Sequence, residues 1–380
     1  MNRAKSDLNS LPELLAQLLA EREASGGLRT LNPCQRNLID FASNDYLGLA
    51  REKESERSDR HASGSTGSRL ISGTTVAHLE LESYLADFYQ AEAALIFNSG
   101  YNANLGVFSA IARREVTIFY DQLVHASIRD GLRLGMGKNY CFKHNDTIDL
   151  AEKLSRCEGP SAIVVESIYS MDGDQAPLFE LVELAEKYQA QLIVDEAHSS
   201  GIYGQMGQGL VTELELTAKV WARVHTFGKA LGTHGAVVVG SQMLKDFLVN
   251  YSRAFIYTTA LPVGTLQTIR QAHLYIARAV NLRTDLTQKI AFFKELRSAK
   301  LQSMMTKSAS PIQAVILPGN TAVKKCAGFL QERGFFVYPI LSPTVSEGSE
   351  RLRISLHTYN TNQEISALVD ALNSYVACSN

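Results

Sequence analysis

Short runs of hydrophobic residues alternate with helix-like segments through the middle of the chain. The runs cover residues 94–97, 117–120, 162–165, 192–194 and 236–239. Continuous hydrophobic runs of this length are typical of strands that are buried on both faces, as in parallel sheets. Between them, segments such as Leu178 to Tyr188 place their hydrophobic residues at helical spacing. The pattern predicts an α/β/α sandwich with a mostly parallel central sheet.

The pattern changes in the last third of the chain. Helical spacing extends from Thr265 to about Leu296, and shorter strand-like and helix-like segments follow at 312–316, 325–333, 335–340 and 352–356, before a last helix. This order of elements predicts a smaller α+β domain. We therefore expect three parts: an N-terminal arm (1–50), a large α/β domain (51–280) and a small C-terminal α+β domain (281–380).

Two segments near the N-terminus have patterns of their own. Ser10, Pro12 and Glu13 form the start of a helix with a capping box, and the leucines that follow lie at helical spacing. The apolar face of this short helix must pack on the main body or on another subunit. The segment from Arg51 to Arg60 is dense in charge, so we expect an exposed, poorly ordered linker there.

The composition is that of an ordinary soluble protein, with 45% hydrophobic and 20% charged residues among 380. A net charge of -2 gives no broad attraction to nucleic acid or to an anionic membrane. The five cysteines lack the short paired spacings of a zinc site or of a secreted disulfide framework. No run approaches the ~18 apolar residues that span a bilayer. We expect a cytoplasmic protein without a metal site, a membrane span or a nucleic-acid partner.

Lys229 is the most informative residue when it is taken together with Asp195 and His198. The lysine lies in a turn of small residues, and the other two follow a predicted strand in the run Val194-Asp195-Glu196-Ala197-His198. Pyridoxal phosphate (PLP) requires an amine that bonds to its aldehyde and a carboxylate that keeps its pyridine nitrogen protonated. Asp195 suits the second role better than Glu196, because neighbouring strand residues point to opposite faces and His198 lies just beyond Asp195.

Polar residues follow four of the predicted strands, where ligands collect in open α/β sheets. The segment from Asn98 to Asn102 opens a helix whose backbone amides suit a phosphate. His125 follows the next strand and is placed to stack on a cofactor ring, and Ser170 follows a third. Each one alone is typical of a capped helix or a turn, but together with Asp195 they predict a cofactor cleft.

Competing motifs are incomplete. The run from Asp195 to His198 also spells an acidic helicase motif, but Gly228-Lys229 is followed by Ala230 instead of the Ser or Thr of a phosphate loop. No Gly-x-Ser-x-Gly, His-Glu-x-x-His or Cys-x-x-Cys motif is present. The sequence therefore gives no support to a hydrolase or a metalloenzyme.

Motifs along almost the whole chain resemble those of the α-oxoamine synthases, which belong to the fold-type I PLP-dependent enzymes. Besides the Asp195 and Lys229 blocks, they are Ser43–Leu49, Gly67–Leu70, Asn98–Asn104, Ser170–Asp174, Tyr257–Pro262 and Arg351–Arg353. Two further segments, Gly27-Leu28-Arg29 and Ser342-Pro343-Thr344-Val345, are similar to the branch of this family that condenses L-alanine with a pimeloyl thioester in biotin biosynthesis.

The resemblance implies a decarboxylative condensation of L-alanine with a pimeloyl group carried by coenzyme A or acyl carrier protein, and a homodimer with active sites at the subunit interface. It also implies the roles of individual residues. The catalytic residues are Lys229, Asp195, His198 and His125. The cofactor is bound by Gly100, Tyr101, His125, Ser170, Asp195, His198, Thr226, Lys229 and Thr259, and the substrates are bound by Arg29, Asn44, His125 and Arg353.

Three alternatives remain open. Another α-oxoamine synthase, such as a glycine C-acetyltransferase or a serine palmitoyltransferase-like enzyme, would share every cofactor residue. An aminotransferase would share Asp195 and Lys229 but consume a 2-oxo acid without releasing thiol, and a non-catalytic partner subunit would lack the lysine. The chain departs from the family in the short, hydrophilic stretch before Gly64, and at His357 and Asn360, where a threonine and a histidine are common. Substrate choice is therefore the property most open to change.

Overall fold

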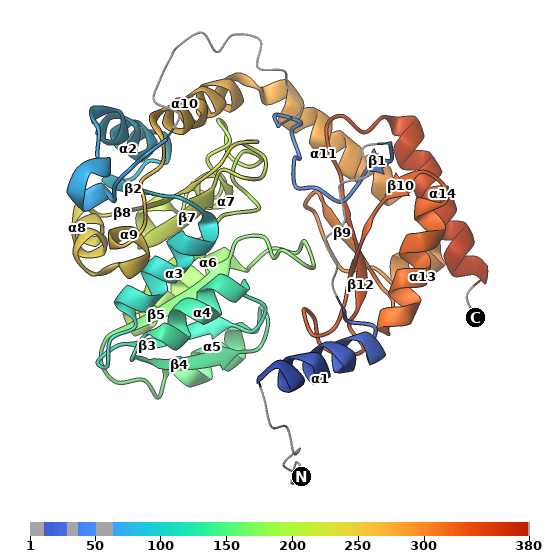
Figure 1. Ribbon diagram of the computed structural model, residues 1–380, viewed down its shortest axis with the longest axis horizontal. Helices are drawn as coiled ribbons and strands as arrows, with labels where there is room; N and C mark the ends of the chain where they lie inside the picture. The colour runs from blue at the N-terminus through green and yellow to red at the C-terminus, as the bar shows by residue number, and fades with distance from the viewer. Residues whose placement is uncertain (1–10, 29–36, 51–63, 379–380) are drawn as a thin grey trace.

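The computed structural model describes residues 11–28, 37–50 and 64–378. A seven-stranded sheet forms the centre of the larger part, with the strand order β2-β8-β7-β6-β5-β3-β4 (Figure 1). The strands are β2 (Ala93–Phe97), β3 (Thr117–Asp121), β4 (Lys138–Phe142), β5 (Ser161–Glu166), β6 (Gln191–Asp195), β7 (Ala222–Thr226) and β8 (Ala236–Gly240). Only β8 runs antiparallel to its neighbours. The predicted mostly parallel sheet is confirmed, and each of the five predicted runs forms a strand.

Helices cover both faces of this sheet, as expected for strands with hydrophobic residues on both sides. One face packs on α3 (Gly100–Ile111), α4 (Ala126–Leu134), α8 (Gln242–Tyr251) and α9 (Arg253–Ile256). The other face packs on α2 (Val76–Phe88), α5 (Thr147–Leu154), α6 (Leu178–Tyr188), α7 (Leu210–Glu213) and α10 (Val263–Arg278). Short turns of helix, η1 (Arg69–Gly73) and η2 (Thr217–Lys219), complete this part.

The smaller part contains a three-stranded antiparallel sheet with the order β11-β12-β9. Its strands are β9 (Ile312–Ile316), β11 (Tyr338–Ile340) and β12 (Arg351–Ser355), and its helices are α11 (Val280–Glu295), α12 (Ala299–Ser303), α13 (Asn320–Gln331) and α14 (Asn362–Cys378). A separate parallel pair joins β1 (Ile39–Asp40) to β10 (Phe335–Phe336). Ile39 and Asp40 are therefore attached to the smaller part. The domain division at residues 50 and 280 stays a prediction.

Two differences from the sequence pattern concern element boundaries. The long helical pattern after Thr265 is broken at Ala279 into α10 and α11, and the strand expected at 335–340 is split at Val337 into β10 and β11. The sequence pattern also did not indicate β4 and β7. β4 is a largely exposed edge strand, and β7 carries Arg223 and His225 among its hydrophobic residues.

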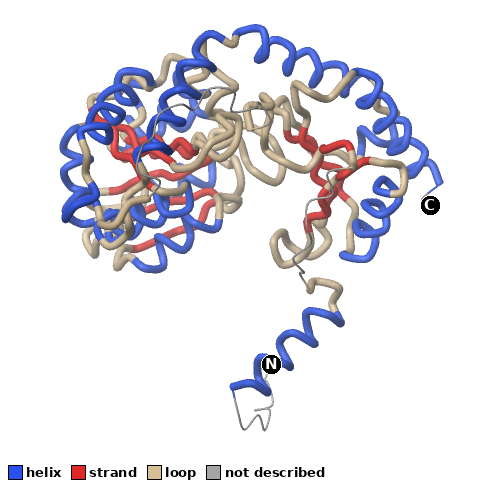
Figure 2. The backbone as a smooth tube through the Cα atoms, turned by 45° about the horizontal axis from the view of Figure 1, so that its top comes forward, coloured by secondary structure: helices blue, strands red, loops and turns tan. Residues whose placement is uncertain are grey.

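Helix α1 (Leu11–Ala24) extends away from both sheets (Figure 2). Leu15 and Leu19 are 51% and 57% exposed, so these two side chains do not pack on the body of the same chain. Packing on another subunit stays a prediction. Ser10 and the linker predicted at Arg51–Arg60 lie outside the described residues. In the described segments, no helix is both long and hydrophobic enough to cross a membrane.

Candidate active site

Lys229 projects from the tight connection between β7 and β8. The connection is closed by backbone hydrogen bonds from Phe227 to Gly235, from Thr233 to Phe227 and from Gly232 to Lys229. Gly232 has a φ of 63°, and a Cβ at this position would lie 2.5 Å from the backbone nitrogen of Ala50. A side chain there is excluded by both the backbone conformation and the available space. The small residues around Lys229 therefore shape the turn that presents its amine.

The Lys229 amine contacts a neutral histidine. Its Nζ lies 2.7 Å from His198 Nε2, and His198 Nδ1 lies 2.9 Å from the Tyr46 hydroxyl. The Tyr46 hydroxyl donates its own proton to Asn44 Oδ1 at 3.0 Å, so it accepts a hydrogen bond from His198 Nδ1. His198 therefore carries its proton on Nδ1 and leaves Nε2 as an acceptor for Lys229.

Arg353 of β12 joins the two parts of the chain at this point. Its Nη2 donates to Asn44 Oδ1 at 2.8 Å, and its Nε donates to the Ser170 carbonyl at 2.7 Å. Arg353 and His198 are both buried. The structure thus brings together Lys229, His198, Asn44, Ser170 and Arg353, which the sequence had predicted from widely separated segments.

Asp195 and Glu166 lie side by side at the ends of β6 and β5, where they are paired in register. Asn104 of α3 donates to Asp195 Oδ2 at 2.7 Å, and the Ala197 amide donates to Oδ1 at 2.9 Å. Glu196 faces the opposite side of the sheet, where it accepts from the Val211 amide of α7 at 2.7 Å. The strand geometry therefore directs Asp195, and not Glu196, toward α3 and Lys229.

Burial determines the charge states in this site. It lowers the pKa of Lys229 to about 8, an effect that Arg353 increases and that Asp195 and Glu166 oppose. Burial, reinforced by the charge of Asp195, raises the pKa of Glu166 well above its ordinary value. Burial and then the charge of Lys229 hold the pKa of His198 well below its ordinary range. The site therefore combines a neutral imidazole, a carboxyl group that retains its proton and an amine that loses its proton readily.

The N-terminus of α3 lies at the other end of the site. Ser99 caps the helix by accepting from the Asn102 amide at 3.2 Å. A Cβ on Gly100 would lie 3.1 Å from Thr226 Oγ1, so the glycine brings the first turn of α3 close to that hydroxyl. Tyr101 and His125 meet edge to face, with ring centroids 6.4 Å apart. His125 caps the N-terminus of α4, where its side chain accepts from the Ser127 amide, and burial lowers its pKa.

The family model described as aminotransferase class I and II matches residues 36–372. The chain belongs to this family. The 8-amino-7-oxononanoate synthase of Methylococcus capsulatus is 39% identical over 88% of this chain and 88% of its own length. The enzyme of the same name from Emericella nidulans is 35% identical over 96% of both chains. These relatives confirm the predicted α-oxoamine synthase resemblance.

Solved structures give the same result for the fold. The serine palmitoyltransferase of Sphingomonas wittichii has a TM-score of 0.86 and 31% identity, with 96% of this chain and 98% of that chain covered. The 8-amino-7-oxononanoate synthase of Francisella tularensis has a TM-score of 0.77 and 30% identity, with 90% and 98% covered. The fold-type I architecture is confirmed.

The residues present fit PLP. The first turn of α3 and the Thr226 hydroxyl suit its phosphate, since a side chain at position 100 would fill the space between them. The buried Asp195 suits the ring nitrogen, and the Lys229 amine suits the aldehyde. Glu166 Oε1 is buried without a hydrogen-bond partner. The site therefore offers a phosphate cradle, a carboxylate and an amine, in agreement with a cofactor that this enzyme family uses.

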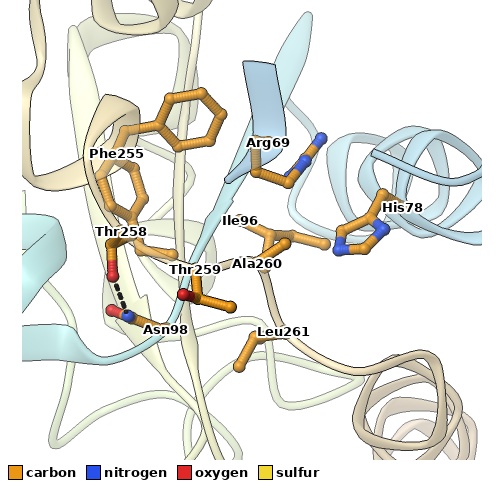
Figure 3. Close-up of a pocket in the computed structure, with 10 residues that line it drawn as sticks. Arg69, His78, Ile96, Asn98, Phe255, Thr258, Thr259, Ala260 and Leu261 are labelled. Carbon is orange, nitrogen blue, oxygen red and sulfur yellow. Dashed lines mark hydrogen bonds between the residues drawn. The ribbon is translucent and has the colours of Figure 1, made fainter. Parts of the chain in front are cut away.

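Two predicted residues are not placed in this cluster. Arg29 lies outside the described residues. Thr259 forms a bridge with Ser68, and the neighbouring Thr258 accepts a hydrogen bond from Asn98 at 2.9 Å, beside the buried Arg69 (Figure 3). The contact between Thr258 and Asn98 brings this loop close to the start of α3. Cofactor binding by Thr259 stays a prediction.

Three residues of the site were not assigned individual roles from the sequence. Tyr46 and Asn104 stand inside motifs that were recognised as blocks, so their types were known but not their contacts. Glu166 ends a predicted strand, as Asp195 does, and this shared position was the available signal. The contact of Glu166 with Asp195 could not be deduced, because the sequences of β5 and β6 do not show that these two strands pair.

His357 and Asn360 contact residues that surround the site and do not contact Lys229 in the hydrogen bonds described here. His357 stacks on Tyr359 with ring centroids 4.6 Å apart and lies 6.3 Å from the Tyr46 ring. The amide of Asn360 donates to the Asp40 carbonyl at 3.1 Å. These two departures from the family pattern therefore pack against the segment that carries Asn44 and Tyr46, one layer away from Lys229.

Proposed function

We propose that this protein catalyses the PLP-dependent decarboxylative condensation of L-alanine with a pimeloyl thioester of coenzyme A or acyl carrier protein. The products are 8-amino-7-oxononanoate, carbon dioxide and the free thiol, as in biotin biosynthesis. The observation that carries this proposal is sequence identity of 35% and 39% to enzymes of that name over most of the chain. The buried cluster around Lys229 supplies the groups that the reaction needs.

PLP, held by the first turn of α3, Asp195 and Lys229, would supply an electron sink for the pair left on the amino-acid Cα after deprotonation. Asp195 keeps the ring nitrogen protonated, and Asn104 holds the Asp195 carboxylate in place. Lys229 Nζ removes the α-proton of alanine, which is favoured by its lowered pKa of about 8. His198, with its proton fixed on Nδ1, offers Nε2 as a hydrogen-bond acceptor to the Lys229 amine.

Arg353 and Asn44 bind the alanine carboxylate in this proposal. Arg353 is buried and already bonded to Asn44 and to the Ser170 carbonyl, so its guanidinium is held in one orientation. A fixed guanidinium suits a carboxylate. The new carbon–carbon bond joins the alanine Cα to the thioester carbonyl, the carbon–sulfur bond breaks, and the carboxylate leaves as carbon dioxide. A proton then returns to Cα.

We also propose that the protein is a cytoplasmic homodimer with Thr259 near the partner's cofactor. Exposed hydrophobic side chains on η1 and α2 support self-association, namely Leu70, Ile71, Val76 and Leu79, which are 53%, 87%, 70% and 54% exposed. Ser68, which directly precedes η1, forms a bridge with Thr259. A hydrophobic surface of this kind on a soluble enzyme is typical of a subunit contact.

A serine palmitoyltransferase-like activity is the second candidate. Its support is the TM-score of 0.86 to the Sphingomonas wittichii enzyme, against 0.77 for the Francisella tularensis enzyme. Both reactions use the same cofactor groups. The difference lies in the amino acid and in the acyl chain.

The test is a matrix of substrates with the PLP-loaded protein. L-alanine, glycine and L-serine are each paired with acetyl-, succinyl-, pimeloyl- and palmitoyl-coenzyme A and with pimeloyl-acyl carrier protein. Free thiol is measured, and the product is identified by mass spectrometry. L-alanine with a pimeloyl thioester is expected to give the highest kcat/KM, and Lys229→Ala is the inactive control. Best turnover of serine with palmitoyl-coenzyme A would establish the second candidate, and consumption of a 2-oxo acid without thiol release would indicate an aminotransferase.

A further inference from the structure

His144, in the loop after β4, lies between two carboxylates outside the cofactor cluster. Its Nδ1 lies 2.9 Å from Asp121 Oδ1, and its Nε2 lies 2.7 Å from Asp174 Oδ2. An ionised carboxylate only accepts hydrogen bonds, and a neutral imidazole has a single N–H to donate. The geometry therefore requires an imidazolium that donates one proton to each carboxylate.

Each carboxylate belongs to a different loop of the active site. Asp121 is fully buried at the end of β3, and its Oδ1 accepts from the Leu123 amide at 2.7 Å, which shapes the turn that leads to His125. Asp174 lies in the hairpin that is closed by the bridge between Ile168 and Gln175. His144 therefore connects the His125 turn to this hairpin.

Asn145 makes the same connection in parallel. Its backbone amide donates to Asp121 Oδ2 at 2.8 Å, and its side-chain amide donates to Asp174 Oδ2 at 2.8 Å. Adjacent residues therefore bridge the same two carboxylates. The arrangement is specific to this pair of loops and is not a general feature of a solvated surface.

The hairpin contacts the smaller part of the structure on its other side. The Ser170 carbonyl accepts from Arg353 Nε at 2.7 Å, and Asp172 pairs with Arg351. The Gly173 carbonyl accepts from the Ser308 hydroxyl at 2.8 Å. The hairpin thus lies between His144 and the guanidinium to which the alanine carboxylate is assigned.

We propose that His144 is a positioning residue. It joins the turn between Asp121 and His125 to the hairpin between Ile168 and Gln175, and thereby fixes the position of Arg353 relative to the bound cofactor. The proposal rests on the function proposed above, because it takes His125 as the stacking group and Arg353 as the carboxylate site. A shift of the hairpin moves the carbonyl that orients Arg353. Amino-acid binding is therefore the step that depends on His144.

The charged state of His144 persists across the pH range of an assay. Burial opposes the charge, but the hydrogen bonds and charges of Asp121 and Asp174 raise the pKa of His144 to about 10. Two other titratable groups face this region. Asp172 interacts with the His144 charge, and the Tyr169 ring contacts the imidazole edge to face with centroids 4.5 Å apart. Burial raises the pKa of the Tyr169 hydroxyl well above its ordinary value, so it stays neutral.

The test compares His144→Gln with His273→Gln in the PLP-loaded enzyme. Glutamine cannot donate to both carboxylates at this site in the way an imidazolium does. His273 is a matched control, because it is buried and bonded through both ring nitrogens, but to Tyr89 and to the Ile269 carbonyl of its own helix α10 and not to the loops that carry Asp121 and Asp174. Amino-acid affinity is measured by titrating the visible spectrum of the bound cofactor, and KM and kcat are measured by thiol release.

His144→Gln is expected to weaken amino-acid binding and raise its KM by about ten-fold or more, with a smaller loss of kcat, since a misplaced binding group of this kind costs on the order of 10–100-fold. His273→Gln should lower the melting temperature and leave both values within two-fold of wild type. Asp174→Asn, at a partly exposed position, should also weaken amino-acid binding. This variant replaces His144→Gln in the test if His144→Gln does not fold. The His144→Gln, Asp174→Asn pair should be non-additive.

A lower melting temperature with unchanged amino-acid affinity in both His144→Gln and Asp174→Asn would overturn the proposal and leave His144 a structural residue. Wild-type turnover separates this result from a failure of the proposed function. If the wild type prefers another amino acid or thioester, the function proposed above is wrong, and the spectral titration is made with the amino acid that the wild type binds. The comparison of His144→Gln with His273→Gln then still decides the role of His144.

Discussion

Lys229 Nζ lies 2.7 Å from His198 Nε2, and the other nitrogen of that imidazole lies 2.9 Å from the Tyr46 hydroxyl. The two contacts form a single polarised chain, because the Tyr46 hydroxyl donates its own hydrogen bond to Asn44 Oδ1. With its proton on Nδ1, the His198 imidazole can donate a hydrogen bond to Tyr46 and accept one from the Lys229 amine at the same time. This chain couples the lysine to the segment that carries Asn44.

Tyr46→Phe should disrupt this coupling. Loss of the hydroxyl leaves the buried His198 Nδ1 without its acceptor, which costs about 1–3 kcal/mol. We expect a lower free energy of unfolding in urea, and also a higher KM for L-alanine because Asn44 loses a partner. Tyr89→Phe is the matched control, since the Tyr89 hydroxyl is also buried and bonds to a buried imidazole, that of His273 at 3.0 Å, which has no contact with Lys229 among its hydrogen bonds. Equal kinetic effects of both variants would contradict a specific role for Tyr46.

The lowered pKa of Lys229 predicts how the apoprotein takes up PLP. A neutral amine is needed to attack the aldehyde, so the rate of uptake should rise with pH through about 8 instead of 10.5. Between these values the folded state binds fewer protons than the unfolded chain, so the free energy of unfolding also increases with pH there. Arg353→Gln removes a charge that lowers this pKa and should move the midpoint upward.

Stopped-flow absorbance gives the uptake rate, and borohydride reduction with peptide mapping gives the attachment site. The label should lie on Lys229. A label on another lysine, or a midpoint that Arg353→Gln leaves unchanged, would show that the amine or its electrostatic environment has been assigned wrongly.

Asp195→Asn should preserve cofactor binding but remove most of the electron-accepting ability of the ring. A carboxylate about 4 Å from a pyridinium contributes roughly 4 kcal/mol at an effective dielectric near 20, or about a thousand-fold in rate. The measurement is exchange of the alanine α-proton in deuterated solvent, followed by NMR. Glu196→Gln is the control, because Glu196 is adjacent, buried and directed to the opposite face. Native exchange in Asp195→Asn would assign the ring nitrogen to another group.

Much of the fold follows from the local hydrophobic pattern, and much of the site does not. Strands such as β5 and β6 are readable because each is a continuous hydrophobic run, and the choice of Asp195 over Glu196 follows from strand alternation alone. The break at Ala279 and the exposed edge strand β4 were missed, since helical spacing continues across the first and no burial pattern marks the second.

Contacts between distant segments are the part that sequence could not supply. The bridge from His144 to Asp121 and Asp174 depends on the order of β3, β4 and β5 in the sheet, which no one segment encodes. The contact of Arg353 with Asn44 similarly depends on how β12 meets the segment after β1. The family resemblance predicted both residues as substrate-binding, but only the folded structure shows the hydrogen bond between them.

The described residues that precede Arg29 in the sequence are held on the smaller part of the structure. Asn320, at the start of α13, donates from Nδ2 to the Ser25 carbonyl at 2.9 Å and accepts at Oδ1 from the Ser342 amide at 3.0 Å. A Cβ on Gly27 would lie 3.4 Å from the Ser342 carbonyl. The two segments that resemble the pimeloyl-specific branch, one before Arg29 and one at Ser342, are therefore neighbours in space.

Arg29→Ala should weaken use of the pimeloyl thioester and leave L-alanine binding unchanged. A guanidinium pairs with the far carboxylate of a pimeloyl chain, which acetyl and fatty acyl groups lack and which a succinyl chain is too short to present at the same place. Loss of a charge-assisted hydrogen bond of about 2 kcal/mol raises the KM for the thioester by roughly thirty-fold. Arg22→Ala removes an exposed charge from the same arm and should have no effect. Equal turnover of several acyl chains by the wild type, or loss of alanine binding in Arg29→Ala, would falsify this assignment and leave the acyl specificity to other residues.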